Sequence, residues 1–262
     1  MEHVSYALPG PEDNTREVFL KNIHFRLTPG EVLLVAGPSA SGKSTLARLL
    51  VGLSALRSGK VRFNGVDAHR WPKDELGQHI GYLPQNIELL DGTLAENIAR
   101  FGDIDEQQLA TVIDLLDLHA FVASLPDGLQ TRIGAEGAFL SGGRRQLVGL
   151  ARAVYGNPRI VILDEPNANL DQAGEMALAA AVRELKERGT TLMIVGHRPS
   201  TLAQVDKVLF LKDGRVELFG SREDVLGRLR LAAGESARVA PPARETGAAG
   251  QRLEDAPADQ RA

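Results

Sequence analysis

Short apolar runs rich in β-branched residues alternate with stretches of helical periodicity along the chain. The clearest runs are residues 32–36, 160–163 and 192–195, each short and apolar enough to form a strand that is buried on both faces. Because helical stretches follow such runs, the pattern predicts an α/β fold with a mainly parallel sheet at its core.

Two stretches have the period of a helix. In residues 105–118, apolar positions recur at i, i+3, i+4 and i+7, which predicts an amphipathic helix inside a helical insertion of roughly residues 86–156. Residues 175–188 have a second apolar face, basic residues near their end and a glycine, Gly189, to stop the helix. We expect this second helix to link two strands of the sheet.

The last part of the chain carries a turn signal and then loses its apolar pattern. Asp213-Gly214 separates apolar runs at 208–211 and 215–218, and glycine supplies the positive φ of a tight hairpin turn. Residues 232–262 are rich in Ala, Pro, Gly and mixed charge and have few large apolar side chains. We therefore expect one ordered domain over residues 1–231 and a disordered tail over 232–262.

Composition excludes several classes of function. The 262 residues include 30 Lys and Arg against 34 Asp and Glu, a net charge of −4, which is not the electrostatic footprint of a nucleic-acid-binding protein. The absence of Cys excludes disulfides, thiolate nucleophiles and Cys-ligated metals. No apolar run approaches the ~20 residues of a bilayer-spanning helix, and the first residues lack a signal-peptide pattern, so the chain itself is expected to be soluble.

A glycine-rich loop after the first buried strand carries the first sign of chemistry. It fits G-x-x-x-x-G-K-[ST], directly before a helical stretch. In such a loop backbone N–H groups and the helix dipole bind phosphates, while Lys43 meets the β and γ oxygens and Ser44 ligates Mg²⁺. By itself the loop leaves kinases, GTPases, helicases and transport ATPases open. Its residues are Gly37, Pro38, Ser39, Ala40, Ser41, Gly42, Lys43 and Ser44.

Two carboxylates end the strand at 160–163. Asp164 and Glu165 lie at its carboxyl end, the edge of the sheet where α/β folds bind ligands. Asp164 is placed to hold Mg²⁺ through water, and Glu165 to take a proton from an attacking water as a general base. The alternative, an N-cap for the next helix, is disfavoured because Pro166 and Asn167 follow and the helix starts later.

A third motif, LSGGRRQ at residues 140–146, resembles the LSGGQ signature of ATP-binding cassette (ABC) proteins. Ser141 and the two glycines open a helix, which makes a second backbone site for an anion. With the phosphate loop and the acidic strand end, the motif identifies the chain as a member of that family's nucleotide-binding domains. The resemblance implies a P-loop NTPase fold with a mainly parallel sheet, an antiparallel β subdomain and a helical lobe.

The resemblance also assigns roles to single residues. Gln85 looks like the Q-loop glutamine that senses the γ-phosphate, Asp171 belongs to a stretch similar to the D-loop, and His197 looks like the switch histidine. ATP and Mg²⁺ are the implied cofactors, and ATP hydrolysis is the implied activity. The implied catalytic residues are Glu165, His197, Gln85 and Lys43; Thr45, Leu140, Ser141, Gly142, Gly143 and Asp171 join the phosphate loop, Gln85 and Asp164 around the nucleotide; and Ser44, Gln85 and Asp164 are the implied metal ligands.

The family's assembly follows from the same resemblance. Two cassettes pair head to tail, so Ser141 of one copy would close over the nucleotide held by Lys43 of the other in an ATP-dependent homodimer. The chain most resembles type I secretion ATPases of the protease and RTX-protein exporter kind. This implies that the chain lies at the cytoplasmic face of the inner membrane, bound to the transmembrane domain of an exporter. Through that domain it would work with a periplasmic adaptor and an outer-membrane channel.

Two positions depart from the family pattern. Leu8 stands where exporters usually carry an aromatic residue that stacks on adenine, and Arg144 replaces the signature glutamine, where its fixed charge either strengthens the contact with ATP or clashes with Arg145. These departures leave open a regulatory cassette with little hydrolysis. Cassettes of lipid, peptide or drug exporters and of importers also remain alternatives, whereas a soluble repair or translation protein would need long coiled-coil insertions or a second cassette. A P-loop kinase would not explain the signature.

Overall fold

The computed structural model describes residues 1–7, 18–134, 139–196 and 203–239. The chain divides into two compact units, Met1–Leu226 and Gly227–Ala262. The site expected from the sequence lies in the first unit.

A six-stranded sheet forms the centre of the first unit, in the order β13–β12–β3–β11–β10–β7. Neighbours from β12 to β7 are parallel, and β13 pairs antiparallel with β12. The strands are β3 (Val32–Ala36), β7 (Ile80–Leu83), β10 (Ile160–Asp164), β11 (Thr191–Val195), β12 (Lys207–Lys212) and β13 (Arg215–Ser221). The mainly parallel sheet and its hairpin, predicted from the sequence, are confirmed.

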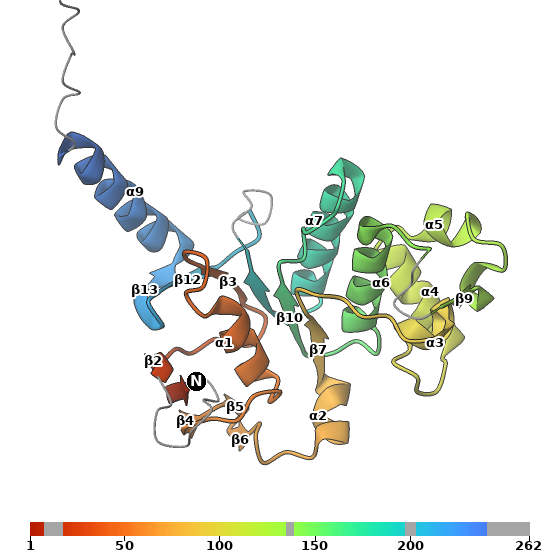
Figure 1. Ribbon diagram of the computed structural model, residues 1–262, viewed down its shortest axis with the longest axis horizontal. Coiled ribbons are helices and arrows are strands. Elements are labelled where there is room, and N and C mark those ends of the chain that lie inside the picture. The colour runs from red at the N-terminus through yellow and green to blue at the C-terminus, as the bar shows by residue number, and fades with distance from the viewer. Residues whose placement is uncertain (8–17, 135–138, 197–202, 240–262) are drawn as a thin grey trace, which may run out of the picture. The chain divides into compact units, whose positions relative to one another are not determined.

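Helices cover both faces of this sheet (Figure 1). On one face, side chains such as Leu33 and Ile162 join helix α1 (Lys43–Leu50) in the main apolar cluster. On the other face lie α6 (Gly142–Val154) and α7 (Gln172–Glu187), which contact β10 and β11 respectively. Because both faces of the sheet are covered at its centre, β3, β10 and β11 are continuous apolar runs and not alternating ones.

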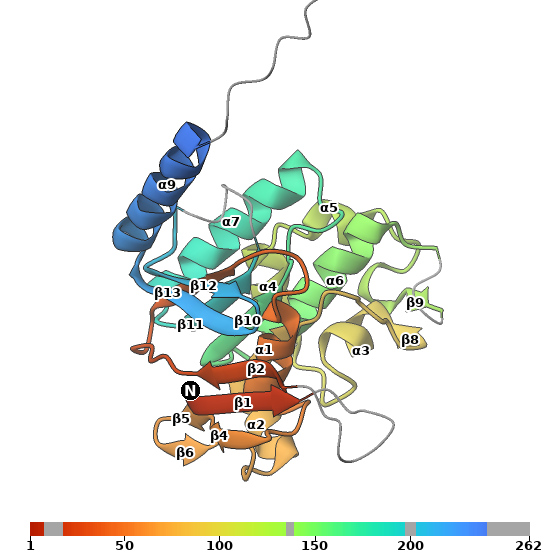
Figure 2. The same ribbon diagram turned by 60° about the vertical axis from the view of Figure 1, so that its left-hand side comes forward.

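A second, antiparallel sheet has the order β2–β1–β4 and borders the same apolar cluster (Figure 2). Val4 of β1 and Leu20 and Ile23 of β2 are fully buried in that cluster. This sheet is the antiparallel β subdomain that the family resemblance implies. The elements of this part are β1 (Glu2–Ala7), β2 (Val18–Ile23), β4 (Ser58–Lys60), β5 (Arg62–Phe63), β6 (Val66–Asp67) and α2 (Lys73–His79).

The insertion between β7 and β10 is mainly helical, as expected. The helix expected at 105–118 is α4 (Glu106–Leu115), which begins where the Asp105 carboxylate accepts hydrogen bonds from the backbone N–H groups of Gln107 and Gln108. A capping box of Thr93 and Glu96 starts α3. The other elements of the insertion are β8 (Gly92–Thr93), α3 (Leu94–Ile98), α5 (His119–Ala123), the 3₁₀ helix η1 (Gly128–Gln130), β9 (Arg132–Ile133) and α6.

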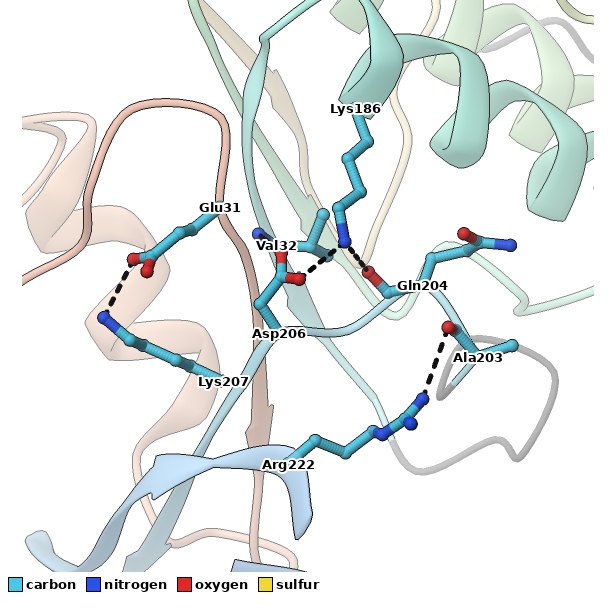
Figure 3. Close-up of polar contacts among 8 residues, drawn as sticks. All are labelled: Glu31, Val32, Lys186, Ala203, Gln204, Asp206, Lys207 and Arg222. Atoms are coloured by element: carbon cyan, nitrogen blue, oxygen red, sulfur yellow. Dashed lines mark hydrogen bonds and ion pairs between the residues drawn. The ribbon is translucent and has the colours of Figure 1, made fainter. Parts of the chain in front are cut away.

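Two ion pairs and a hydrogen bond connect α7 and the start of β12 to the start of β3 (Figure 3). The Lys186 ammonium donates to the Asp206 carboxylate at 2.6 Å, and the same carboxylate accepts from the backbone N–H of Val32 at 2.9 Å. Lys207 donates to Glu31 at 2.9 Å. These contacts lie at the amino end of β3, opposite the edge that carries the phosphate loop.

The C-terminal boundary differs from the expectation. Helix α9 spans Arg222–Val239, so regular structure continues past Leu231, where we expected a disordered tail to begin. Helix formation satisfies the backbone locally, and alanines at 232 and 233 are strong helix formers, so this stretch forms a helix even though it has few large apolar side chains. Residues 240–262 lie outside the described part. Among the described residues, no helix is long and apolar enough to cross a membrane.

The turn between β12 and β13 provides a stability test. Asp213 and Gly214 both have positive φ, and a Cβ on Gly214 would lie 1.8 Å from the carbonyl oxygen of Phe19 in β2. We expect Gly214→Ala to lower the free energy of unfolding by roughly 2–5 kcal/mol, since it adds a clash with backbone to the strain of a positive φ. Chemical denaturation measures this.

The matched control is Gly65→Ala. Gly65 also has a positive φ, but a Cβ there meets no atom of the described residues within 4 Å. This variant should lose only about 1 kcal/mol, the strain term alone. Equal losses in the two variants would show that the contact between the hairpin turn and β2 is not tight.

Candidate functional site

The phosphate loop joins β3 to α1 and is curled around its own lysine. The Lys43 ammonium donates to the carbonyl oxygens of Gly37 at 2.9 Å and Pro38 at 2.8 Å. Ala40 and Gly42 have φ values of 60° and 104°, which reverse the chain sharply within the loop. A backbone of this shape turns its N–H groups inward, the arrangement that binds phosphate oxygens.

A buried hydroxyl in this loop has no hydrogen-bond partner among the described residues. The side chain of Ser41 is almost completely buried, and its Oγ makes no hydrogen bond there. Such groups are uncommon in folded proteins and call for an explanation. A loop that receives part of its hydrogen bonding from a bound ligand provides one.

Ser44 and Asp164 meet at the carboxyl edge of the parallel sheet, and Gln85 follows the neighbouring strand at the same edge. Asp164 ends β10 and is 1% exposed, and the Ser44 hydroxyl donates to its Oδ1 at 3.1 Å. In the parallel register Leu83 of β7 lies beside Leu163 of β10, so Gln85 follows two residues later at the same edge and is exposed. The oxygen ligands expected for Mg²⁺ therefore come from three neighbouring segments.

Burial shapes the charge of this edge. It raises the pKa of the Asp164 carboxyl, and the hydrogen bond from Ser44 opposes the rise. Burial, together with the Asp164 charge, raises the pKa of Tyr82 on the adjacent strand to about 12. The site therefore holds a desolvated acid whose charged form would be favoured by a cation.

Glu165 leaves the strand in a different direction from Asp164. Its φ is 52°, uncommon for a residue with a side chain, and its N–H donates to the Val195 carbonyl at 2.9 Å. The amide of Gln146 in α6, 2% exposed, donates to the carbonyl oxygens of Glu165 at 3.4 Å and Pro166 at 3.0 Å. The signature motif assigns Gln146 no role of its own; the one signal in the sequence is an amide on the buried, otherwise apolar face of α6.

The signature residues open α6, as expected. Ser141 is its N-cap, and its Oγ accepts from the backbone N–H of Arg144 at 3.3 Å. A Cβ on Gly143 would lie 2.7 Å from the Asn169 carbonyl oxygen, so the glycine allows the stretch after β10 to approach the helix start. Asp171, at the end of that stretch, caps α7 by accepting from the N–H of Gly174 at 2.8 Å.

The remaining predicted residues fall in different places. The Arg144 guanidinium lies over the ring of Phe121 in α5, 5.3 Å from its centroid, so this cation has a partner inside the helical insertion. Leu140 is buried just before α6, and Thr45 is half-buried in α1. Leu8 and His197 lie outside the described residues; His197 comes next after Gly196, which follows β11.

Comparison with known proteins supplies the family. The sequence profile described as "ABC transporter" matches residues 20–168. The chain belongs to the ABC transporter family. The matched residues form an ATP-binding domain of this family; such domains are ATPases, and the family generally binds ATP with Mg²⁺.

Individual relatives of this ABC domain are longer than the chain itself. It is 44% identical over 221 residues, 84% of its length, to the type I secretion system ATP-binding protein PrsD of Rhizobium meliloti (strain 1021), and spans 38% of that protein. It is 35% identical to human ATP-binding cassette sub-family B member 6, covering 86% of this chain and 26% of the relative. For the ATP-dependent lipid A-core flippase of Burkholderia orbicola (strain AU 1054) the identity is 35%, over 79% of this chain and 35% of the relative.

A solved structure agrees with the fold. The structure of a bacterial Atm1-family ABC exporter with ATP bound superposes with a TM-score of 0.79 at 31% identity, covering 90% of this chain and 41% of that one. The ABC ATPase fold that the sequence predicted is thus confirmed. The chain spans about two fifths of the length of that exporter.

The strained alanine of the phosphate loop makes one prediction. Ala40 has a φ of 60°, a region that glycine enters without strain. We expect Ala40→Gly to raise the free energy of unfolding by about 0.5–1 kcal/mol. Ala120→Gly, on an exposed position of helix α5, is the control and should lower it by a similar amount. If both variants were less stable than the parent, the backbone of Ala40 would not be strained.

Asp164 makes a second prediction. Because its pKa is raised in the folded chain, the folded state binds the proton more tightly than the unfolded state between the two pKa values. Stability conferred by the protonated group therefore falls as pH rises through that window and stays lower above it. Without nucleotide, Asp164→Asn should be more stable than the parent at pH 8 and should flatten this part of the pH profile. Thermal unfolding from pH 4 to 8 measures it.

The control for this substitution is Asp103→Asn, at an exposed position. It should leave the pH profile of stability close to that of the parent. An Asp164→Asn chain that is less stable than the parent at pH 8 would mean that the ionised carboxylate stabilises the nucleotide-free fold.

Proposed function

We propose that the chain is the ATP-hydrolysing cassette of an exporter of the type I protein-secretion kind. The identity of 44% to the type I secretion protein PrsD, against 35% to the lipid A-core flippase, favours protein export over lipid export. The alternatives within the family are cassettes of lipid, peptide or drug exporters and a regulatory cassette with little hydrolysis.

The assignment of the nucleotide and Mg²⁺ site rests mainly on one contact. The hydrogen bond of 3.1 Å between Ser44 Oγ and Asp164 Oδ1 joins the phosphate loop to the acidic end of β10. A hydroxyl, a carboxylate and the amide oxygen of Gln85 form the kind of oxygen donor set that suits Mg²⁺, with few carboxylates and the remaining positions left to phosphate and water. Bound Mg²⁺ would neutralise charge that develops on the phosphates.

The chain's own residues would bind and orient the nucleotide. The loop N–H groups and the start of α1 hold the phosphates, and the Lys43 ammonium exchanges the carbonyls of Gly37 and Pro38 for β and γ oxygens. The Ser41 hydroxyl is a further donor in the same loop. Positioning and electrostatics of this kind account for most of the rate of phosphoryl transfer.

Water activation is assigned to Glu165. Its turned backbone separates its side chain from that of Asp164, so one carboxylate serves the metal and the other accepts a proton from the attacking water. Gln146 fixes the backbone carbonyls on both sides of this turn. We assign His197 the role of contacting the γ-phosphate, in line with its place directly after β11 and Gly196.

Pairing of two copies would complete each site. Ser141 is exposed at the start of a 13-residue helix, so its hydroxyl, the N–H groups of Gly142 and Gly143 and the helix dipole are available to a phosphate held by another copy. ATP would then bridge two chains, and its hydrolysis would release them. This is the head-to-tail homodimer expected from the family resemblance.

A membrane domain is the second proposed partner, because the chain covers at most about two fifths of these longer relatives. Leu90, Phe101 and Ile104 are large apolar side chains exposed on the segment that follows Gln85. We assign this segment to contact with the exporter's transmembrane domain at the cytoplasmic face of the inner membrane. The periplasmic adaptor and outer-membrane channel would be reached through that domain.

Glu165→Gln tests the function. Removal of a general base lowers turnover by ~10² to 10⁴-fold, so phosphate release should nearly stop while Mg·ATP binding is retained. The variant should also accumulate as an Mg·ATP-dependent dimer in sedimentation experiments, because the two chains no longer separate when ATP is not hydrolysed. Glu187→Gln, at an exposed position at the end of α7, is the control and should hydrolyse ATP like the parent. Normal turnover by the Glu165 variant would refute the assignment.

A further inference from the structure

Two arginines lie side by side, each partly buried, where the helical insertion meets the sheet. Burial lowers the pKa of both Arg100 and Arg152, and the Arg152 charge lowers that of Arg100 further. Among the described residues, their hydrogen-bond partners are carbonyl oxygens of the backbone and of one amide side chain, and not carboxylates. Two neighbouring positive charges that are partly removed from water and not paired with carboxylates are unfavourable. Their hydrogen bonds to fixed carbonyl oxygens must offset this cost, which suggests that the arrangement has a specific role.

Arg152 connects α6 to the segment that begins at Gln85. Its guanidinium donates to the carbonyl oxygen of Glu88 at 2.9 Å, to that of Asn97 at 2.9 Å and to Oδ1 of Asn97 at 2.7 Å. The fully buried Asn97 amide in turn holds Leu90 twice: Oδ1 accepts from its N–H at 3.0 Å, and Nδ2 donates to its carbonyl at 2.8 Å. The far end of the Gln85 segment is therefore fixed by the side chains of Asn97 and Arg152.

Arg100 anchors the same arrangement to the end of α6. It donates to the carbonyl oxygens of Arg152 at 2.9 Å, Ala153 at 3.2 Å and Tyr155 at 3.2 Å, so a positive charge lies at the negative end of the helix. A further bond of 2.7 Å reaches the Gly77 carbonyl in α2, outside the insertion. Arg100 and the next residue, Phe101, both have φ values of 58°, so the chain adopts a strained turn to place this guanidinium.

The connected helix carries the signature at its other end. Ser141 caps the start of α6, and Gln146 on the same helix holds the backbone around Glu165. The arginine contacts are hydrogen bonds of 2.7–3.2 Å from partly buried cations. A displacement of Glu88 or Leu90 therefore has to move α6 or leave partly buried donors without partners, which is unfavourable.

We propose that Asn97, Arg100 and Arg152 are positioning residues that couple the segment after Gln85 to helix α6, and thereby set the place of Ser141 for pairing with a second copy. They act on pairing and turnover and not on the binding of ATP by one chain, because none of them belongs to the phosphate loop. This proposal rests on the proposed function. It adds to it the physical link between the segment assigned to the membrane domain and the signature.

Hydrogen exchange of the nucleotide-free chain tests the link without any activity. Arg152→Lys retains the charge but loses the planar fork that reaches three oxygens. We expect exchange to accelerate about fivefold or more at the Leu90 amide and also at the Arg144 and Arg145 amides, at the opposite end of α6. Arg70→Lys, at an exposed surface arginine, is the control and should change neither. Acceleration confined to the residues around position 152, or spread uniformly over the chain, would overturn the proposal.

Pairing provides the second readout. In a Glu165→Gln background, Arg152→Lys should leave the affinity of the single chain for a fluorescent ATP analogue unchanged and weaken Mg·ATP-dependent dimerisation about tenfold, the usual size of such couplings. In the parent background kcat should fall with KM retained. Equal dimerisation with and without Arg152→Lys would overturn the coupling.

The design separates failure of this proposal from failure of the proposed function. If Glu165→Gln alone does not dimerise with Mg·ATP, the proposed function is wrong. The exchange experiment still tests whether the segment after Gln85 is coupled to helix α6. Should Arg152→Lys fail to fold, Arg100→Lys replaces it in both experiments. That variant loses contacts at the end of α6 and at Gly77, and the same amides and the same dimerisation are then expected to respond.

Discussion

The parallel register of β3, β11, β10 and β7 is the constraint on which the rest of the molecule depends. Parallel strands end at a common edge, so residues that follow different strands are brought together there even though they are far apart in sequence. The phosphate loop follows β3, Asp164 ends β10 and Gln85 follows β7. A shift of β10 by one residue would turn Asp164 to the other face and break its contact with Ser44, 120 positions away.

Ionisable side chains partly removed from water occur both at the proposed nucleotide site and in the helical insertion. Burial raises the pKa of Asp164 at the sheet edge and lowers the pKa of Arg100 and Arg152 beneath the insertion. In the first region the Asp164 carboxylate accepts a hydrogen bond from Ser44 and is proposed to bind Mg²⁺; in the second, the guanidinium groups donate to carbonyl oxygens. We propose that burial of a charged group serves ligand binding in one case and the connection between two segments in the other.

The sequence predicted those features that depend on local periodicity or on a contiguous motif. The buried strands, the helix at α4, the Asp213-Gly214 hairpin and the capped signature helix are of this kind. Helix α9 extends further than expected because backbone hydrogen bonding requires no apolar face. Gln146, Arg100 and Arg152 could not be assigned from the sequence, since their partners are mostly backbone carbonyls brought near by tertiary packing, and a carbonyl leaves no mark in the sequence.

Under the proposed function, two copies of this chain hydrolyse ATP together at sites shared between them. The most direct measurement is the rate of phosphate release per chain by the unmodified protein with Mg·ATP over a wide range of protein concentrations. We expect a rate per chain that rises steeply with concentration and then saturates, because each proposed site needs Ser141 from a second copy. A rate per chain that is independent of concentration, or no release at any concentration, would contradict it.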